Sequence, residues 1–133
     1  MRRPLRILLI GSTGVFGARI AERLAGLGGL ELVLAARSAD RLRALQARLA
    51  PKMHAMPPAC LPIDRTTLGV ETLMALEADL VIDAAGPFQG AAPIVARAAI
   101  AAGVNYLDIA DARDFVGAIG AANYIGKACG LRR

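Results

Sequence analysis

The 133-residue chain suits one domain, residues 1–133, and is too short for a dinucleotide-binding domain joined to a full substrate domain. Hydrophobic residues make up 56% and charged residues 20%, a globular composition that excludes a disordered chain. The net charge of +5 favours anionic partners, but the arginines are scattered and only 4% of residues are aromatic, so we expect no nucleic-acid partner.

The cysteines and the apolar runs bear on disulfide bonds, metal binding and membrane association. Cys60 and Cys129 lie far apart and form no CxxC pair, so we predict no disulfide framework, no metal site and a reducing, cytoplasmic setting. No stretch reaches the roughly 18 apolar residues of a membrane helix. The apolar run over residues 5–10 is too short for the core of a signal peptide. We therefore expect no membrane partner.

Apolar runs alternate with helical patterns in the first half of the chain. In order, they predict a strand over residues 5–10, a helix over residues 15–27, a strand over residues 31–36 and a helix from a cap at Ser38 to Pro51. On the first helix, four apolar residues recur at helical spacing and are expected to face the core: Phe16, Ile20, Leu24 and Leu27.

The alternation continues in the second half. It predicts a strand over residues 59–63, a helix over 67–77, a strand over 80–83, a helix over 91–102, a strand over 104–109 and a last helix over 114–127. Strands that alternate with helices indicate an α/β fold, a Rossmann-type doubly wound parallel sheet of five strands in the order 3-2-1-4-5.

The last residues lie where a sixth strand of this plan would begin. The strand would start just after Gly130, and the sequence stops at Arg133, so we expect the sixth strand to be truncated. An uncovered fifth strand would leave an exposed sheet edge, and exposed edges invite pairing. We therefore predict association between copies of the chain.

A glycine-rich segment between the first strand and the first helix is the strongest functional signal. Its GxxGxxG spacing, on a strand–turn–helix, is typical of a turn that binds a dinucleotide pyrophosphate at a helix N-terminus. The alternative is a tight turn without a ligand. The predicted cofactor-binding residues here are Gly11, Ser12, Thr13, Gly14, Val15, Phe16 and Gly17.

The end of the second strand indicates which dinucleotide is bound. Sites that prefer NAD place an acid there for the ribose 2′-hydroxyl, but this strand runs into Arg37 and Ser38, with Arg41 nearby. A guanidinium matches a phosphate with two parallel hydrogen bonds, so the sequence favours NADP over NAD. Asp40 is interpreted as a first-turn residue favoured by the helix dipole. The alternative, that Ser38 only caps a helix and both arginines are solvated, stays open.

Two further segments follow the fourth and fifth strands, at the edge where open α/β sheets bind ligands. The first is predicted to border the nicotinamide half of the cofactor, through Ala85, Gly86, Pro87 and Phe88. In the second, Asp108 and Asp111 are weak catalytic candidates that could orient substrate or transfer a proton. The favoured alternative is that Asp111 or Asp114 only caps the last helix.

Together these residues resemble the N-terminal NAD(P)-binding domain of the saccharopine dehydrogenase-like oxidoreductases. The resemblance spans about residues 5–115 and rests on the glycine segment, on Ala36-Arg37-Ser38, on Ala85-Gly86-Pro87-Phe88 and on Tyr106-Leu107-Asp108. It implies pyridine-nucleotide redox chemistry with the substrate bound largely by a second domain, which we expect to be absent from this chain. We therefore expect the isolated chain to be inactive.

The sequence bears on two other hypotheses. A non-catalytic nicotinamide-dinucleotide-binding module, such as a redox-sensing regulator, stays open. A short-chain-type reductase is disfavoured because the Tyr-x-x-x-Lys pair of that class is absent: Tyr124 and Lys127 are only three residues apart.

Overall fold

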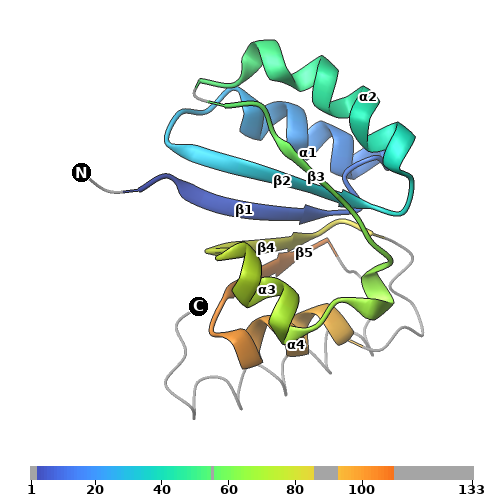
Figure 1. Ribbon diagram of the computed structural model, residues 1–133, viewed down its shortest axis with the longest axis vertical. Coiled ribbons are helices and arrows are strands. Elements are labelled where there is room, and N and C mark those ends of the chain that lie inside the picture. The colour runs from blue at the N-terminus through green and yellow to red at the C-terminus, as the bar shows by residue number, and fades with distance from the viewer. Residues whose placement is uncertain (1–2, 55, 86–92, 110–133) are drawn as a thin grey trace.

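The computed structural model describes residues 3–54, 56–85 and 93–109. Within them, five parallel strands form one sheet in the order β3-β2-β1-β4-β5, and the strand arrows point the same way (Figure 1). The strands are β1 (Leu5–Ile10), β2 (Leu30–Ala36), β3 (Ala59–Pro62), β4 (Leu80–Asp83) and β5 (Asn105–Asp108). The predicted α/β fold and strand order are confirmed.

Helices cover both faces of this sheet. The helices α1 (Val15–Ala25) and α2 (Ala39–Leu49) lie on one face, and α3 (Val70–Leu76) and α4 (Ile94–Ala102) lie on the other (Figure 1). Two short 3₁₀ turns, η1 (Ala50–Lys52) and η2 (Arg65–Thr67), extend the connections before and after β3. This layering is the doubly wound arrangement expected when parallel strands are joined by helical crossovers.

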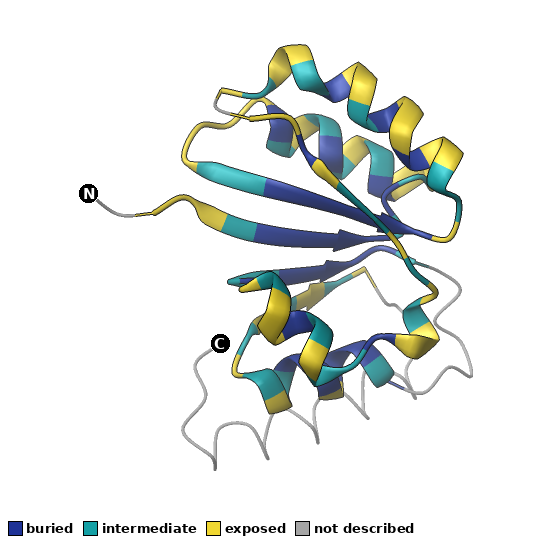
Figure 2. Cartoon of the chain, viewed as in Figure 1, coloured by how far each residue is buried: buried dark blue, intermediate teal, exposed yellow. Residues whose placement is uncertain are grey.

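The centre of the sheet is buried on both faces. Leu8 and Leu9 in β1 point to opposite faces and are both 0% exposed, each within a different apolar cluster. Figure 2 shows the buried colour running along β1 and β2 toward the ends of their arrows. Burial on both faces explains why these strands are continuous apolar runs with no polar alternation.

The core-facing side of α1 differs from the prediction. The buried residues are Gly17, Ala21 and Ala25, whereas Phe16 and Leu27 are 63% and 56% exposed. Small residues at four-residue spacing let the helix lie close to the sheet. Ile20 and Leu24 pack only at the border of the core. The helix also ends at Ala25, with Gly26 as its C-cap, so Leu27 lies outside it.

The segment predicted as a helix over residues 67–77 is divided in two. The 3₁₀ turn η2 ends before Leu68, whose backbone is extended, and α3 begins only after the extended Gly69. Glycine has a low helix propensity and is well suited to an N-cap, which explains the later start. In the next predicted helix, α4 begins at Ile94, after Pro93.

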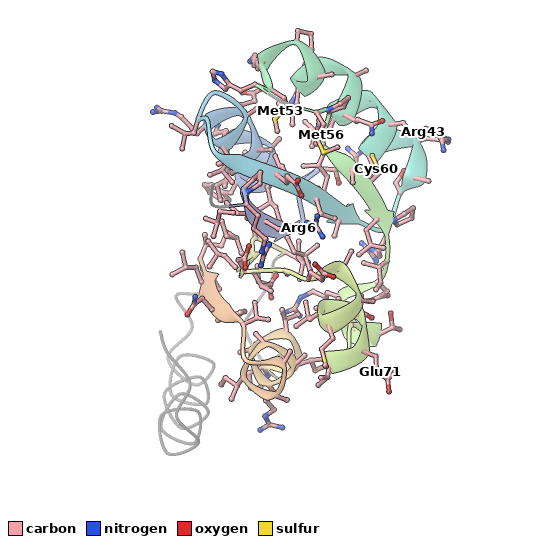
Figure 3. All side chains as sticks on the ribbon, turned by 60° about the vertical axis from the view of Figure 1, so that its left-hand side comes forward. Arg6, Arg43, Met53, Met56, Cys60 and Glu71 are labelled. Atoms are coloured by element: carbon pink, nitrogen blue, oxygen red, sulfur yellow. The ribbon has the colours of Figure 1, made fainter. Side chains whose placement is uncertain are left out.

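Ion pairs fix the amino-terminal edge of the sheet, where β1, β2 and β4 begin. Arg6, labelled in Figure 3, donates to the Glu31 carboxylate at 2.9 Å and to the Leu76 carbonyl at 2.7 Å. The hydrogen bond to Glu31 raises the pKa of Arg6. Arg3 forms an ion pair of 2.6 Å with Asp79, the residue before β4. Arg3, Arg6, Glu31 and Asp79 are therefore paired within the fold.

β5 is the last strand at its side of the described sheet. Leu107 on this strand is 57% exposed, and Ile109, just after it, is 41% exposed. Association through this edge stays a prediction. The expected sixth strand and the helix expected over residues 114–127 lie outside the described residues. Among the described helices, none has the length and apolar character needed to cross a membrane.

Candidate functional site

The glycine-rich turn joins β1 to α1 at the carboxyl edge of the sheet. Gly11 has a φ of +75°, a backbone conformation that residues with a side chain rarely adopt. A Cβ atom at this position would lie 2.6 Å from the Ala85 nitrogen, so the backbone that follows β4 passes directly over Gly11. The first glycine therefore serves both the turn and the close approach of a second segment.

The other two glycines differ in whether the fold itself excludes a side chain at their positions. A Cβ on Gly17 would lie 1.9 Å from the Gly11 carbonyl oxygen, so the turn packs against α1 only if Gly17 has no side chain. Gly14 has an ordinary φ of −76°, is exposed, and its Cβ would meet only the Gly11 oxygen at 3.4 Å. Nothing in the described fold requires a glycine at position 14.

Gly14 is also the N-cap of α1, where no side chain caps the helix. The first N–H groups of a helix have no partner within it, and the helix dipole makes this end attractive to anions. Val15 and Phe16 follow and are exposed. Ser12 is 0% exposed and its hydroxyl donates to the Ala35 carbonyl at 3.2 Å, so its side chain anchors the turn to β2.

At the end of β2, Arg37 and Arg41 are exposed and their guanidinium groups form no ion pair with any residue the structure describes. Ser38 caps α2 by accepting a hydrogen bond from the Arg41 backbone N–H at 3.2 Å. Asp40 forms an ion pair with Arg43 on the same helix. Two cations therefore lie beside the end of β2 without a carboxylate bound to them.

Asp64 lies just beyond β3, near Arg37. It accepts hydrogen bonds from the backbone and the hydroxyl of Thr66 at 2.9 and 2.8 Å, and these bonds lower the pKa of Asp64 below its ordinary value. The nearby Arg37 and Arg65 act in the same direction. Asp64 is thus an ionised cap of η2.

A buried ion pair at the end of β4 was not predicted from the sequence. Asp83 is 0% exposed, and its carboxylate accepts from Arg65 of η2 at 2.6 Å and from the Ala85 backbone N–H at 3.1 Å. Burial raises the pKa of Asp83, while Arg65 opposes that shift. The available signal was an aspartate that directly continues a buried apolar strand, because buried carboxylates are almost always paired.

Two acidic residues lie side by side where β4 and β5 end, because Asp83 and Asp108 are partners in the strand register. Asp108 accepts a hydrogen bond from the Tyr106 hydroxyl at 2.8 Å. Burial raises the pKa of Tyr106, and the neighbouring carboxylates add to the shift. Asp111, Gly86, Pro87 and Phe88 lie outside the described residues.

The described part of this edge offers binding groups for anions and no metal site. No three His, Cys, Asp or Glu residues are grouped to hold a metal ion within the described residues. Along one edge lie an uncapped helix N-terminus, two arginines without ion-pair partners and a fixed segment at Ala85. Such an arrangement can hold an extended molecule with several phosphates.

Comparison with known proteins identifies relatives of this chain. Residues 7–124 match the model of the family described as "Saccharopine dehydrogenase NADP binding domain". Two proteins of Mycobacterium tuberculosis, from strains H37Rv and CDC 1551, are each 35% identical over 109 residues and are both named "Putative trans-acting enoyl reductase". The match covers 80% of this chain but only 25% of each relative, so this chain spans about a quarter of their length.

Solved structures show the same fold at low identity. A β-ketoacyl-[ACP] reductase of Bacteroides thetaiotaomicron superposes with a TM-score of 0.60 at 21% identity, over 96% of this chain and 68% of that one. An Escherichia coli oxidoreductase, yciK, gives 0.52 at 17% identity, over 89% and 50% of the two chains. At such identities the likeness concerns the fold alone.

Proposed function

The chain belongs to the saccharopine dehydrogenase NADP-binding domain family, and from this premise we propose that it holds NADPH along the carboxyl edge of its sheet for hydride transfer. Family membership supports a nicotinamide dinucleotide as the cofactor. The choice of NADPH over NADH is our proposal, as are the residues that bind it.

The single observation that carries this proposal is the difference between the three glycines. The fold accounts for Gly11 and Gly17 by close backbone contacts, whereas it leaves Gly14 exposed and with room for a side chain. A ligand backbone that approaches position 14 would account for the second glycine. The pyrophosphate would then lie against the N–H groups at the start of α1.

The 2′-phosphate is assigned to Arg37, with Arg41 as a weaker contributor. Both guanidinium groups are exposed and without ion-pair partners among the described residues, and Asp40 is bound to Arg43. An acid that would hold a ribose 2′-hydroxyl is absent between Ala36 and Ser38. The charges present suit a phosphate better than a hydroxyl.

The reaction itself is proposed from the relatives' names. Hydride from the bound cofactor, together with a proton, would reduce a carbon–carbon double bond of an enoyl substrate held mainly by residues outside this chain. The described residues of this chain contribute binding and orientation. Asp108, which is bonded to Tyr106 at the end of β5, is our candidate for orienting the substrate.

The experiment is a titration of the wild-type chain with NADPH and NADH at low and moderate salt. We expect tighter binding of NADPH, with a preference that falls at higher salt because screening weakens the charge pair. Arg37→Ala should weaken NADPH roughly ten- to a hundred-fold, the loss expected for one charge-assisted hydrogen bond, and leave NADH nearly unchanged. Arg41→Ala should act in the same direction more weakly.

Arg43→Ala is the matched control, because Arg43 lies on α2 with Arg41 and is already paired with Asp40. It should change neither affinity by more than about two-fold, since exposed ion pairs contribute little. Equal binding of NADPH and NADH by the wild type, or equal weakening of both by Arg37→Ala, would contradict the assignment of the 2′-phosphate.

A further inference from the structure

The carboxylate of Asp83 connects two parts of the chain that belong to different elements. One oxygen accepts from the Arg65 guanidinium at 2.6 Å, and the other accepts from the Ala85 N–H at 3.1 Å. Arg65 comes from η2, after β3, while Asp83 ends β4, which lies beyond β2 and β1 in the sheet. The side chain of Arg65 is 16% exposed and that of Asp83 is 0% exposed, so water reaches this pair only at its margin.

The segment held by Asp83 is the same one that packs on the glycine-rich turn. The position of a Cβ on Gly11 would lie 2.6 Å from the Ala85 nitrogen and 2.8 Å from the Ala84 carbonyl carbon. Ala84 also donates its N–H to the Ile10 carbonyl at 2.8 Å. A small rotation of the Asp83 carboxylate would therefore shift the backbone that lies directly on the turn.

The neighbours of Asp83 make a cation favourable at this position. Asp108 is its register partner on β5, and Tyr106 donates to Asp108 on the same face of the sheet. Two adjacent carboxylates repel each other, and burial strengthens that repulsion. Arg65 faces Asp83 from η2 and offsets the charge of Asp83, so its guanidinium fixes which way that carboxylate points.

We propose that Arg65 is a positioning residue for the nicotinamide half of the dinucleotide, because it orients Asp83 and so holds Ala84 and Ala85 against the glycine-rich turn. The inference rests on the proposed function. The nicotinamide half of a dinucleotide would extend along the sheet edge from β1 toward β4 and β5, whereas the adenine half would lie over β2. Loss of Arg65 should therefore affect the two halves unequally.

The test compares NADPH with adenosine 2′,5′-bisphosphate, which carries the adenine half and both of its phosphates but no nicotinamide ribose. In the 133-residue chain, Arg65→Met should weaken NADPH about ten-fold and change the affinity for the bisphosphate by less than about two-fold. Arg65→Lys keeps the charge and should recover part of the NADPH affinity. Circular dichroism and a thermal melt of each variant report the fold.

Arg65→Met leaves a buried carboxylate without its guanidinium and risks a failure to fold. The double variant Arg65→Met/Asp83→Asn removes both charges and leaves an amide oxygen that can still accept from the Ala85 N–H. The double variant should fold and keep its affinity for the bisphosphate. Its affinity for NADPH should fall as that of the single variant does. Arg3→Gln is the matched control, because it breaks an ion pair to Asp79 at the opposite end of β4 and should leave both affinities unchanged.

Each outcome bears on the proposal separately from the proposed function. If the wild type binds both compounds and the folded double variant loses both equally, or loses neither, Arg65 has no positioning role while the dinucleotide site stands. If the wild type binds neither compound, the proposed function fails and this inference fails with it. If Arg3→Gln lowers the affinity for NADPH more than the affinity for the bisphosphate, any ion pair beside β4 has the same effect. That result also overturns the proposal.

Discussion

Burial raises the pKa of the Tyr106 hydroxyl, and the carboxylates of Asp83 and Asp108 act in the same direction. A tyrosine whose pKa is raised on folding stabilises the fold below its unfolded pKa of about 10. That contribution is lost as the pH rises from there through the folded pKa. Tyr106 should therefore add to the alkaline sensitivity of the domain.

The measurement is the free energy of unfolding in urea from neutral pH to alkaline pH, for the wild type and for Tyr106→Phe. Above about pH 10, the wild type should lose stability faster than the variant by at most about 1.4 kcal/mol per pH unit, the slope of one proton. At neutral pH, Tyr106→Phe should cost about 1 kcal/mol, because one hydrogen bond is lost. Parallel curves for the two proteins would mean that Tyr106 ionises as freely in the fold as in the unfolded chain.

Individual residues also mark the limit of the sequence analysis. Arg37 and Arg41 could be proposed for a phosphate because they lie within a few residues of a recognisable strand end. Arg65 could not, because its partner Asp83 is 18 residues away and the two meet only once the chain has crossed the sheet from β3 to β4. Sequence spacing does not specify such contacts between separate elements.

At the scale of elements, the turn between β1 and α1 allows the roles of two glycines to be separated. Gly17→Ala would place a Cβ 1.9 Å from the Gly11 carbonyl oxygen, a backbone atom that cannot move aside. We expect a loss of about 3 kcal/mol or more in the free energy of unfolding, because such overpacking must displace α1 from the sheet. Urea unfolding measures this loss directly.

Gly14→Ala is the matched variant within the same turn. Its φ of −76° suits alanine and its nearest contact would be 3.4 Å, so its stability should change by no more than about 1 kcal/mol, the usual effect at an N-cap. Its NADPH affinity should nevertheless fall at least ten-fold, because the methyl group would occupy the approach of the pyrophosphate. Wild-type NADPH affinity in Gly14→Ala would contradict this role for the second glycine.

The accuracy of the predicted elements follows from how each one is buried. Strands β1, β2 and β4 were predicted from apolar runs because burial on both faces demands such runs. The predicted inward face of α1 is wrong because the prediction follows the large residues Phe16 and Leu27. A helix packed closely on a sheet buries small residues, and in α1 these include alanines. The extended break at Gly69 was missed because the apolar spacing continues across it.

At the scale of the whole molecule, parallel crossovers determine where the site lies. All five described strands run the same way, so the site residues gather at the carboxyl ends of strands. The glycine-rich turn, Arg37 and Asp64 follow such ends, and Asp83 and Asp108 are the last residues of β4 and β5. The ion pairs of Arg3 and Arg6 lie at the other edge. The strand order was predictable because connection rules leave few alternatives for such a pattern.

The central claim is that a nicotinamide dinucleotide lies along this carboxyl edge, and mapping of backbone amide NMR shifts on addition of NADPH tests it most directly. The largest shifts should occur at residues 11–17, at Arg37 and Ser38, and at Ala85. Gly28 and Asp79, which lie before β2 and β4 at the opposite edge, should not move. Shifts centred on the opposite edge, or no saturable shifts at all, would contradict the account.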